Sequence, residues 1–198
     1  MKILNLYAGI GGNRKLWGDN HEITSVELDK KVANTYKELF PKDNVIVADA
    51  HEYLLDHYKD YDFIWSSPPC QSHSTTNYFT QYIRKRPVYP SMKLHQEIIF
   101  LDNFYKGKFC VENVVSYYEP LIKPLKIGRH YLWSNFSIPL IKQPKSDVGG
   151  MNHKAGYNTA NKKPLVDRNA VNSELGLHIL NQALGIIKEN NVEQNKLF

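Results

Sequence analysis

Short apolar runs alternate with longer amphipathic stretches along the first 112 residues of the chain. The runs are rich in β-branched residues and almost continuously apolar, which is typical of strands covered on both faces. They predict strands at residues 2–8, 22–27, 44–49, 62–67 and 108–113. Because strands that alternate with helices form a parallel sheet through crossover connections, the pattern predicts an α/β fold with a Rossmann-like, doubly wound and mostly parallel sheet.

The amphipathic stretches predict helices at residues 29–40, 50–58 and 92–105. In the first of these, Asp29 is the expected N-cap, and Val32, Tyr36 and Leu39 are spaced to share one face. A last helix is expected after Ser173, which can cap it. Its apolar face consists of Leu175, Ile179, Leu180, Ala183, Leu184 and Ile187.

The pattern changes after a further expected strand at 129–138. Residues 139–168 contain prolines, glycines and asparagines, show no hydrophobic period, and carry six basic residues against two acidic ones. We therefore expect a main domain over 1–138, a short basic loop region over 139–168, and a C-terminal segment over 169–198 that returns to the main domain.

Composition limits the class of protein. A chain of 198 residues with 42% apolar and 12% aromatic residues is long and apolar enough for one folded domain. The apolar runs are far shorter than a membrane span, and the N-terminus does not read as a signal peptide. Two cysteines give no disulfide framework, so a reducing, cytoplasmic setting is expected. The net charge of +5 suits an anionic partner such as nucleic acid.

A glycine-rich turn, NLYAGIGG, follows the first strand, and a helix is expected to start near Asn13. Glycines let the backbone approach a ligand closely. The next strand ends in Glu27, at the spacing where α/β nucleotide folds place a carboxylate on ribose hydroxyls, and the third ends in Asp49. Asp49 alone would also serve as an N-cap. Together these features favour an adenosine-type cofactor, and the absence of GxxxxGK[ST] disfavours a phosphate-cradling NTPase.

Cys70 stands in the segment SSPPCQSHS, directly after the fourth expected strand. Pro68 and Pro69 fix their φ angles and stiffen the approach, and a nucleophile gains from being held in place. The basic residues 84–86 in the loop that follows are placed to lower the pKa of the thiol and to meet phosphates. The alternative is an unreactive loop cysteine.

Glu112 begins the segment ENV at the end of the fifth expected strand. A glutamate at the end of a buried strand is costly unless it has a partner or a chemical role. Cys110, between Phe109 and Val111, is expected to pack in the core.

The segments LYAGIGG, SVELD, VADA, SPPCQSHS, VENV and RNAV (168–171), in this order and spacing, resemble the ordered motifs of the cytosine carbon-5 methyltransferases. The resemblance covers nearly the whole chain. It implies a class I methyltransferase fold with S-adenosylmethionine as methyl donor and S-adenosylhomocysteine as product. We assign no metal ligands.

The resemblance also implies residue roles. Tyr7 stands where an aromatic packs on the cofactor, Glu27 would bind the ribose hydroxyls, and Asp49 would bind the adenine amine. The whole implied cofactor site consists of Tyr7, Ala8, Gly9, Gly11, Gly12, Glu27, Leu28, Asp49, Ala50, Pro69, Leu94, Asn169, Ala170 and Val171.

The family's chemistry implies three catalytic residues. Cys70 would add to carbon 6 of cytosine, which makes carbon 5 nucleophilic enough to accept the methyl group. A protonated Glu112 would stabilise the charge that develops on the ring nitrogen, and Arg129 would stabilise the charge on the carbonyl oxygen. The target base must leave the duplex stack to reach the thiol.

The chain departs from the family's pattern in three places. The earlier arginine of the usual arginine-x-arginine pair is Ile127, the arginine-rich penultimate motif is not evident, and the recognition domain is reduced to 139–168. The expected nucleic-acid contacts are Gln71, Ser74, Arg84, Arg86, His153, Lys154, Lys162 and Lys163, with Tyr157 and Asn158 as further candidates. Because few of these side chains are available to read base edges, either sequence specificity is loose or a partner protein supplies it.

Three functions stay open at this point. The first is a DNA cytosine methyltransferase from a bacterium or phage, in a restriction, self-protection or regulatory role. The second is an RNA methyltransferase, since SPPCQ also resembles relatives that methylate transfer RNA, although their Cys-Phe-Thr is absent here. The third is a non-catalytic relative that keeps the cofactor site.

Overall fold

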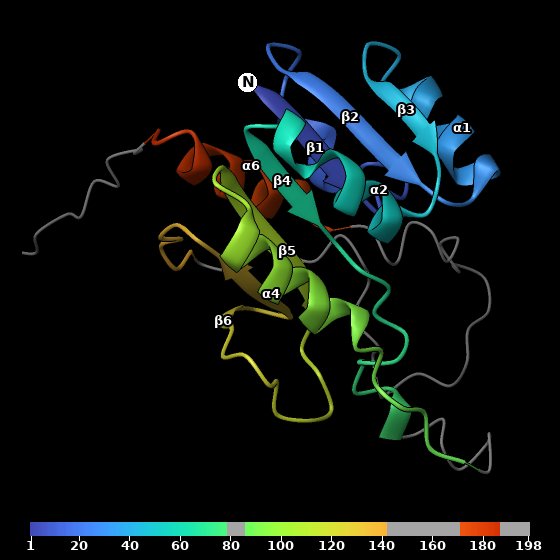
Figure 1. Cartoon of the computed structure of the whole chain (residues 1–198), viewed down its shortest axis with the longest axis vertical. Helices are drawn as coiled ribbons and strands as arrows, with labels where there is room; N and C mark the ends of the chain where they lie inside the picture. Colours follow the sequence, from blue (N-terminus) through green and yellow to red (C-terminus); the bar gives the residue numbers. More distant parts are fainter. Residues whose placement is uncertain (79–85, 142–170, 187–198) are drawn as a thin grey trace, which may run out of the picture.

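Seven strands form one sheet in the computed structural model, which describes residues 1–78, 86–141 and 171–186. Their order is β3-β2-β1-β4-β5-β7-β6 (Figure 1). The strands are β1 (Lys2–Leu6), β2 (Glu22–Glu27), β3 (Asn44–Val47), β4 (Phe63–Ser66), β5 (Lys108–Val114), β6 (Leu125–Ile127) and β7 (His130–Ser134). All five strands predicted over the first 112 residues are therefore present, with ends shifted by up to two residues.

The first five strands of the sheet are parallel, and β7 runs antiparallel between β5 and β6. This arrangement confirms the α/β, Rossmann-like fold with a mostly parallel sheet. The strand expected at 129–138 is shorter than predicted, and β6 was not predicted. With three residues, β6 is too short to show an alternation that could be read from the sequence.

The helices are α1 (Lys30–Leu39), α2 (Ala50–His57), α4 (Lys93–Phe104) and α6 (Ser173–Ala183), with 3-10 turns η1 (Asn13–Leu16) and η2 (Tyr58–Asp60). Asp29 caps α1 as predicted, because its carboxylate accepts from the backbone N–H of Lys31 at 2.7 Å and of Val32 at 3.3 Å. The helix expected near Asn13 is only one 3-10 turn.

Two expectations about helices were wrong. Asn172, not Ser173, caps α6, because Asn172 has the non-helical backbone of a cap and its side-chain oxygen accepts from the N–H groups of Glu174 and Leu175. In α1, Leu39 is 56% exposed, and the buried residues are Ala33 and Tyr36.

Two layers of apolar side chains cover the sheet, one on each face. On one face α2 and α4 pack on Leu4, Ile64 and Val111, and Figure 1 shows these helices in front of the strands. On the other face α6 packs with Trp17 on alternating residues of the same strands, including Cys110. Cys110 is fully buried, as predicted for a core residue. The C-terminal helix therefore completes the core of the sheet. No helix in the described parts of the chain is long and apolar enough to cross a membrane.

Candidate active site

One cavity of about 1320 Å³ opens along the edge of the sheet where the parallel strands end. Its walls come from the segments that follow β1 to β5, from the turn between β6 and β7, and from the start of α4. The lining contains most of the predicted site residues, namely Tyr7, Ala8, Gly9, Gly12, Glu27, Leu28, Asp49, Ala50, Pro69, Cys70, Gln71, Ser74, Leu94, Glu112, Arg129 and Val171. The fold thus brings together residues that lie up to 164 positions apart in the sequence, from Tyr7 to Val171.

Some predicted residues do not line this cavity. Gly11 faces the rings of Tyr36 and Phe40, which a side chain there would overlap, and its φ of +78° is unfavourable for other residues. Its lack of a side chain therefore serves packing behind the turn. Arg86 is exposed and is not part of the lining. The other predicted residues lie outside the described part of the chain: Arg84, His153, Lys154, Lys162, Lys163, Asn169 and Ala170.

The glycine-rich turn has the left-handed backbone that its sequence indicates. Gly9 has a φ of +56° and open space where a side chain would lie, so its backbone borders the cavity directly. Tyr7 also has a positive φ, +55°. The carboxylate of Glu27 accepts from the backbone N–H of Gly9 and of Asp29, each at 2.9 Å. These contacts fix Glu27 between the ends of β1 and β2.

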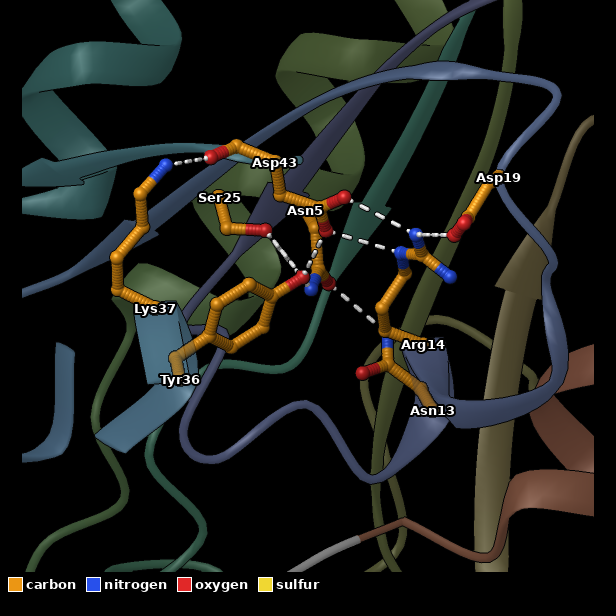
Figure 2. A network of polar contacts seen from close by, with 8 residues as sticks. All are labelled: Asn5, Asn13, Arg14, Asp19, Ser25, Tyr36, Lys37 and Asp43. Atoms are coloured by element: carbon orange, nitrogen blue, oxygen red, sulfur yellow. Dashed lines mark hydrogen bonds and ion pairs between the residues drawn. The ribbon is translucent and has the colours of Figure 1, made fainter. Parts of the chain in front are cut away.

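A buried polar network supports this turn from behind (Figure 2). Asn13, at the end of the turn, donates to the side chain of Asn5 in β1 at 2.8 Å. The next residue, Arg14, donates to both carboxylate oxygens of Asp43, at 2.9 and 3.0 Å. Tyr36 of α1 donates to the same carboxylate at 2.8 Å and accepts from Ser25 in β2 at 2.7 Å. The network therefore joins the turn to β1, β2 and α1.

Asp49 caps α2, as one of its two expected roles requires, and it also borders the cavity. Its carboxylate caps α2 by accepting from the backbone N–H groups of His51 at 2.8 Å and of Glu52 at 3.4 Å, and it also lines the cavity. Burial acts to raise the pKa of Asp49, but these two N–H groups and the nearby Lys93 outweigh it, so the pKa is lowered. The carboxylate is therefore a charged acceptor at neutral pH.

Glu97 of α4 supports residues at the cavity and was not predicted from the sequence. Its side chain is fully buried and accepts hydrogen bonds from Tyr7, from His51 at 3.0 Å and from Ser66 at 2.7 Å. Burial and the charge of Glu97 raise the pKa of Tyr7, and the hydrogen bond to Glu97 raises that of His51. The available signal was a charged residue on the apolar face of the helix, between Leu94 and Leu101.

The loop that carries Cys70 is held by several hydrogen bonds. The backbone oxygen of Cys70 accepts from the N–H groups of His73 and Ser74, both at 3.0 Å. Asn113, next to Glu112, donates its side-chain amide to the backbone oxygen of Pro68 at 2.9 Å. Two of the predicted motifs, SPPCQ and ENV, are therefore connected directly, and the thiol is held in a fixed place on the cavity wall.

The pKa of the Cys70 thiol is raised, and the expected lowering by basic residues is not supported by Arg86, while Arg84 and Lys85 lie outside the described residues. Burial, with a further contribution from the negative charge of Glu112, raises the pKa of this thiol. Arg86, the described member of the 84–86 cluster, does not lie in the cavity that the thiol faces. The thiol is therefore protonated at neutral pH rather than activated.

Glu112 has the partner that its burial requires. The residue is 5% exposed, and one of its carboxylate oxygens lies 2.6 Å from Nδ1 of His130 in β7. Arg129 lines the cavity from the turn before β7, where Gly128 has a φ of +58°. Ile127, at the place of the family's earlier arginine, is buried in the core. Of residues 127–129, Arg129 alone can therefore offer a cation to a ligand.

A family model described as "C-5 cytosine-specific DNA methylase" matches residues 1–116, and no curated protein matches the chain. Among solved structures, a DNMT2 variant from Spodoptera frugiperda shares 28% identity, with 57% of this chain and 35% of that chain covered and a TM-score of 0.39. This chain thus spans about a third of that protein.

Two further structures are similar at lower identity. The methyltransferase EhMeth from Entamoeba histolytica shares 14% identity over 74% of this chain and 57% of that chain, with a TM-score of 0.46. An S-adenosylmethionine-dependent methyltransferase from Agrobacterium tumefaciens shares 16% identity over 60% and 40%, with a TM-score of 0.42. The family match extends over more than half of the chain and over the motifs from LYAGIGG to VENV. The chain belongs to the C-5 cytosine-specific DNA methylase family.

Proposed function

We propose that this protein is a DNA cytosine-5 methyltransferase that uses S-adenosylmethionine and forms a covalent adduct between Cys70 and a flipped-out cytosine. One observation carries the proposal. A single cavity is lined both by the residues assigned to the cofactor, such as Gly9, Glu27 and Asp49, and by the assigned nucleophile and acid, Cys70 and Glu112. Methyl transfer requires the donor and the base to meet in one cavity.

The residues at one end of the cavity fit S-adenosylmethionine. The Gly9 backbone borders open space, Glu27 and Asp49 provide carboxylates, and Leu28 offers an apolar side chain that is 69% exposed. Glu27 would bind ribose hydroxyls, Asp49 the adenine amine, and Leu28 the face of the adenine ring. When bound, the cofactor supplies an electrophilic methyl group.

The other end of the cavity holds the groups that would act on the base. Cys70, as thiolate, forms a bond to carbon 6, and the electron pair of the carbon 5–carbon 6 double bond moves toward carbon 5 and the ring nitrogen. Glu112 gives its proton to that nitrogen, and Arg129 binds the carbonyl oxygen. Held on a stiff loop, the thiol is available only to a base that has left its stack.

We propose DNA rather than RNA as the substrate because the description of the matching family names DNA. The basic segment 139–168 would contribute phosphate contacts, with specificity loose or supplied by a partner protein. RNA methylation and cofactor binding without catalysis are the competing functions. A cytoplasmic setting and a bacterial or phage origin are part of the same proposal.

Transfer of a labelled methyl group from S-adenosylmethionine separates the three functions. The purified protein is incubated with duplex DNA, single-stranded DNA or RNA, and the nucleosides are analysed for 5-methylcytosine. We expect product in DNA from the wild type and none from Cys70→Ser, while calorimetry gives similar cofactor affinity for both. Product in RNA alone would support the second function. Cofactor binding without product in any nucleic acid would support the third.

A further inference from the structure

The antiparallel pairing of β5 and β7 places His130 beside Glu112. In this ladder Glu112 lies opposite Leu132, and Val114 lies opposite His130. Glu112 and His130 are therefore diagonal neighbours on one face of the sheet, within reach of each other's side chains. Both side chains are largely buried, at 7% and 14% exposed, and both line the cavity.

Among the described residues, no lysine or arginine forms an ion pair with Glu112. Arg129 and Lys126 line the same cavity, but both are exposed and neither forms an ion pair with this carboxylate. The 2.6 Å contact with Nδ1 of His130 is thus the interaction that compensates its burial. A carboxylate and an imidazole N–H at this distance form a short, charge-assisted hydrogen bond.

The charge of Glu112 also affects the nucleophile. Burial and the negative charge of Glu112 raise the pKa of Cys70, so an uncompensated Glu112 carboxylate opposes formation of the thiolate. A proton held between Glu112 and His130 would neutralise this charge and would be available to a base in the cavity.

We propose that His130 is a positioning residue that holds Glu112 and supplies, through it, the proton that the target base takes up at its ring nitrogen. The inference rests on the proposed methyl transfer and deepens it. As the Cys70–carbon 6 bond forms, the one proton of the Glu112–His130 pair passes through Glu112 to the ring nitrogen, which leaves a Glu112 carboxylate beside a neutral His130. When that bond breaks, the nitrogen returns the proton to the pair.

The reactivity of Cys70 tests the pair without any assumption about the substrate. Iodoacetamide reports on this thiol, because the other cysteine, Cys110, is fully buried. His130→Asn keeps an N–H group near the position of Nδ1 but cannot carry an extra proton. We expect alkylation of Cys70 at neutral pH to be several-fold slower in His130→Asn than in the wild type. It should be faster in Glu112→Gln, because one pKa unit is a tenfold change in thiolate.

The double variant decides whether His130 acts through Glu112. We expect His130→Asn to have no further effect in the Glu112→Gln background. His57→Asn is the matched control, because His57 faces Asp60 in an exposed pair outside the cavity. An equal slowing by His130→Asn with and without Glu112 would overturn the proposal, as would an unchanged rate in both single variants. If His130→Asn folds poorly, the alkylation rate of Cys70 in Glu112→Gln still tests whether the charge of Glu112 controls the thiol.

Single-turnover methylation then tests the proton supply. General acids contribute about 10²–10⁴-fold to rates, so we expect His130→Asn to lose at least tenfold. The loss should grow as the pH rises, since solvent protons replace the missing one only at low pH, and cofactor affinity should not change. A loss that is independent of pH would mean a purely structural role and would reject the proposal. An inactive wild type with the expected alkylation pattern would instead reject the proposed function and leave the coupled pair supported.

Discussion

At the scale of single residues, the buried charges of this protein are compensated by specific partners. Arg14 and Asp43 are each 3% exposed and form a bidentate pair, Glu97 accepts three hydrogen bonds, and Glu112 contacts His130. Removing one member of a buried pair leaves the other charge without a partner, which costs far more than the pair contributes. These residues are therefore the most sensitive polar positions in the fold.

The Arg14–Asp43 pair gives the first prediction. Asp43→Ala should lower the free energy of unfolding by about 3–5 kcal/mol, because it leaves the Arg14 guanidinium buried and without its main acceptor. Asp19→Ala is the matched control, since Asp19 contacts the same guanidinium at 3.5 Å but is 57% exposed, and it should lower the free energy of unfolding far less. Urea titration measures both. Equal losses in the two variants would contradict this account of the network.

His95 gives the second prediction, on pH. It is 2% exposed, and neither ring nitrogen has a hydrogen-bond partner within the described residues, so burial lowers its pKa. The unfolded chain binds a proton below about pH 6.5, whereas the folded His95 resists it, so this residue destabilises the protein as the pH falls. We expect His95→Phe to reduce the loss of stability between pH 8 and pH 5.

The comparison must be made between variants, because other histidines also titrate. Burial lowers the pKa of His73 in the same way, whereas Glu97 raises that of His51, whose stabilisation is present at low pH and lost as the pH rises. Urea titration of the wild type and of His95→Phe at several pH values isolates the difference. An identical pH dependence in the two proteins would show that His95 does not titrate as described.

Some residues of the candidate site could be identified from the sequence alone. Cys70, Glu112, Glu27 and Asp49 could be assigned because each follows a strand in a motif of recognisable order. His130 could not be assigned as the partner of Glu112, because their contact depends on the register of the antiparallel pair β5–β7. The raised pKa of Cys70 was equally out of reach, since it depends on burial in the folded cavity.

At the scale of elements, hydrophobic pattern predicted most of the fold. The parallel strands and α1, α2 and α4 are long or regular enough to show a period, and their limits were correct within about two residues. The three-residue strand β6 shows no period, and the cap of α6 shifted by one residue because Asn172 and Ser173 are both good caps. The hydrophobic pattern also does not predict which element each helix face packs against.

The contact between α6 and η1 illustrates that last point and gives the third prediction. Gly176 in α6 lies against the backbone of Asn13, which an added side chain would overlap. Alanine favours helices over glycine by about 1 kcal/mol, so propensity alone predicts that Gly176→Ala stabilises the protein. We expect the opposite, a loss of about 1–3 kcal/mol, because the clash is with backbone atoms that cannot rotate away.

Denaturation measures this loss, with Gln182→Ala, a half-buried position of the same helix, as control. Because Asn13 also borders the cavity, Gly176→Ala should weaken cofactor binding as well, and Gln182→Ala should not. A stabilised Gly176→Ala protein would mean that α6 does not pack on η1 as described.

At the scale of the whole molecule, the sheet determines where chemistry can occur. The parallel strands all end at one edge, and the segments that follow them form one cavity there. The location of the site at this edge could be predicted from the sequence, because that prediction needs only the order of strands and loops. The sequence could not place the basic segment 139–168, which has no hydrophobic period and of which residues 142–168 lie outside the described part of the chain. Its role in binding nucleic acid stays a prediction.

The most direct test of the central claim is the mass of the intact protein after reaction with an oligonucleotide that contains 5-fluorocytosine, in the presence of S-adenosylmethionine. Fluorine at carbon 5 prevents the final elimination, so the bond between Cys70 and carbon 6 should persist. The account predicts a species with the combined mass of protein, oligonucleotide and one methyl group, mapped to Cys70 and absent in Cys70→Ser. Methylation of ordinary cytosine without this species, or the same species in Cys70→Ser, would contradict it.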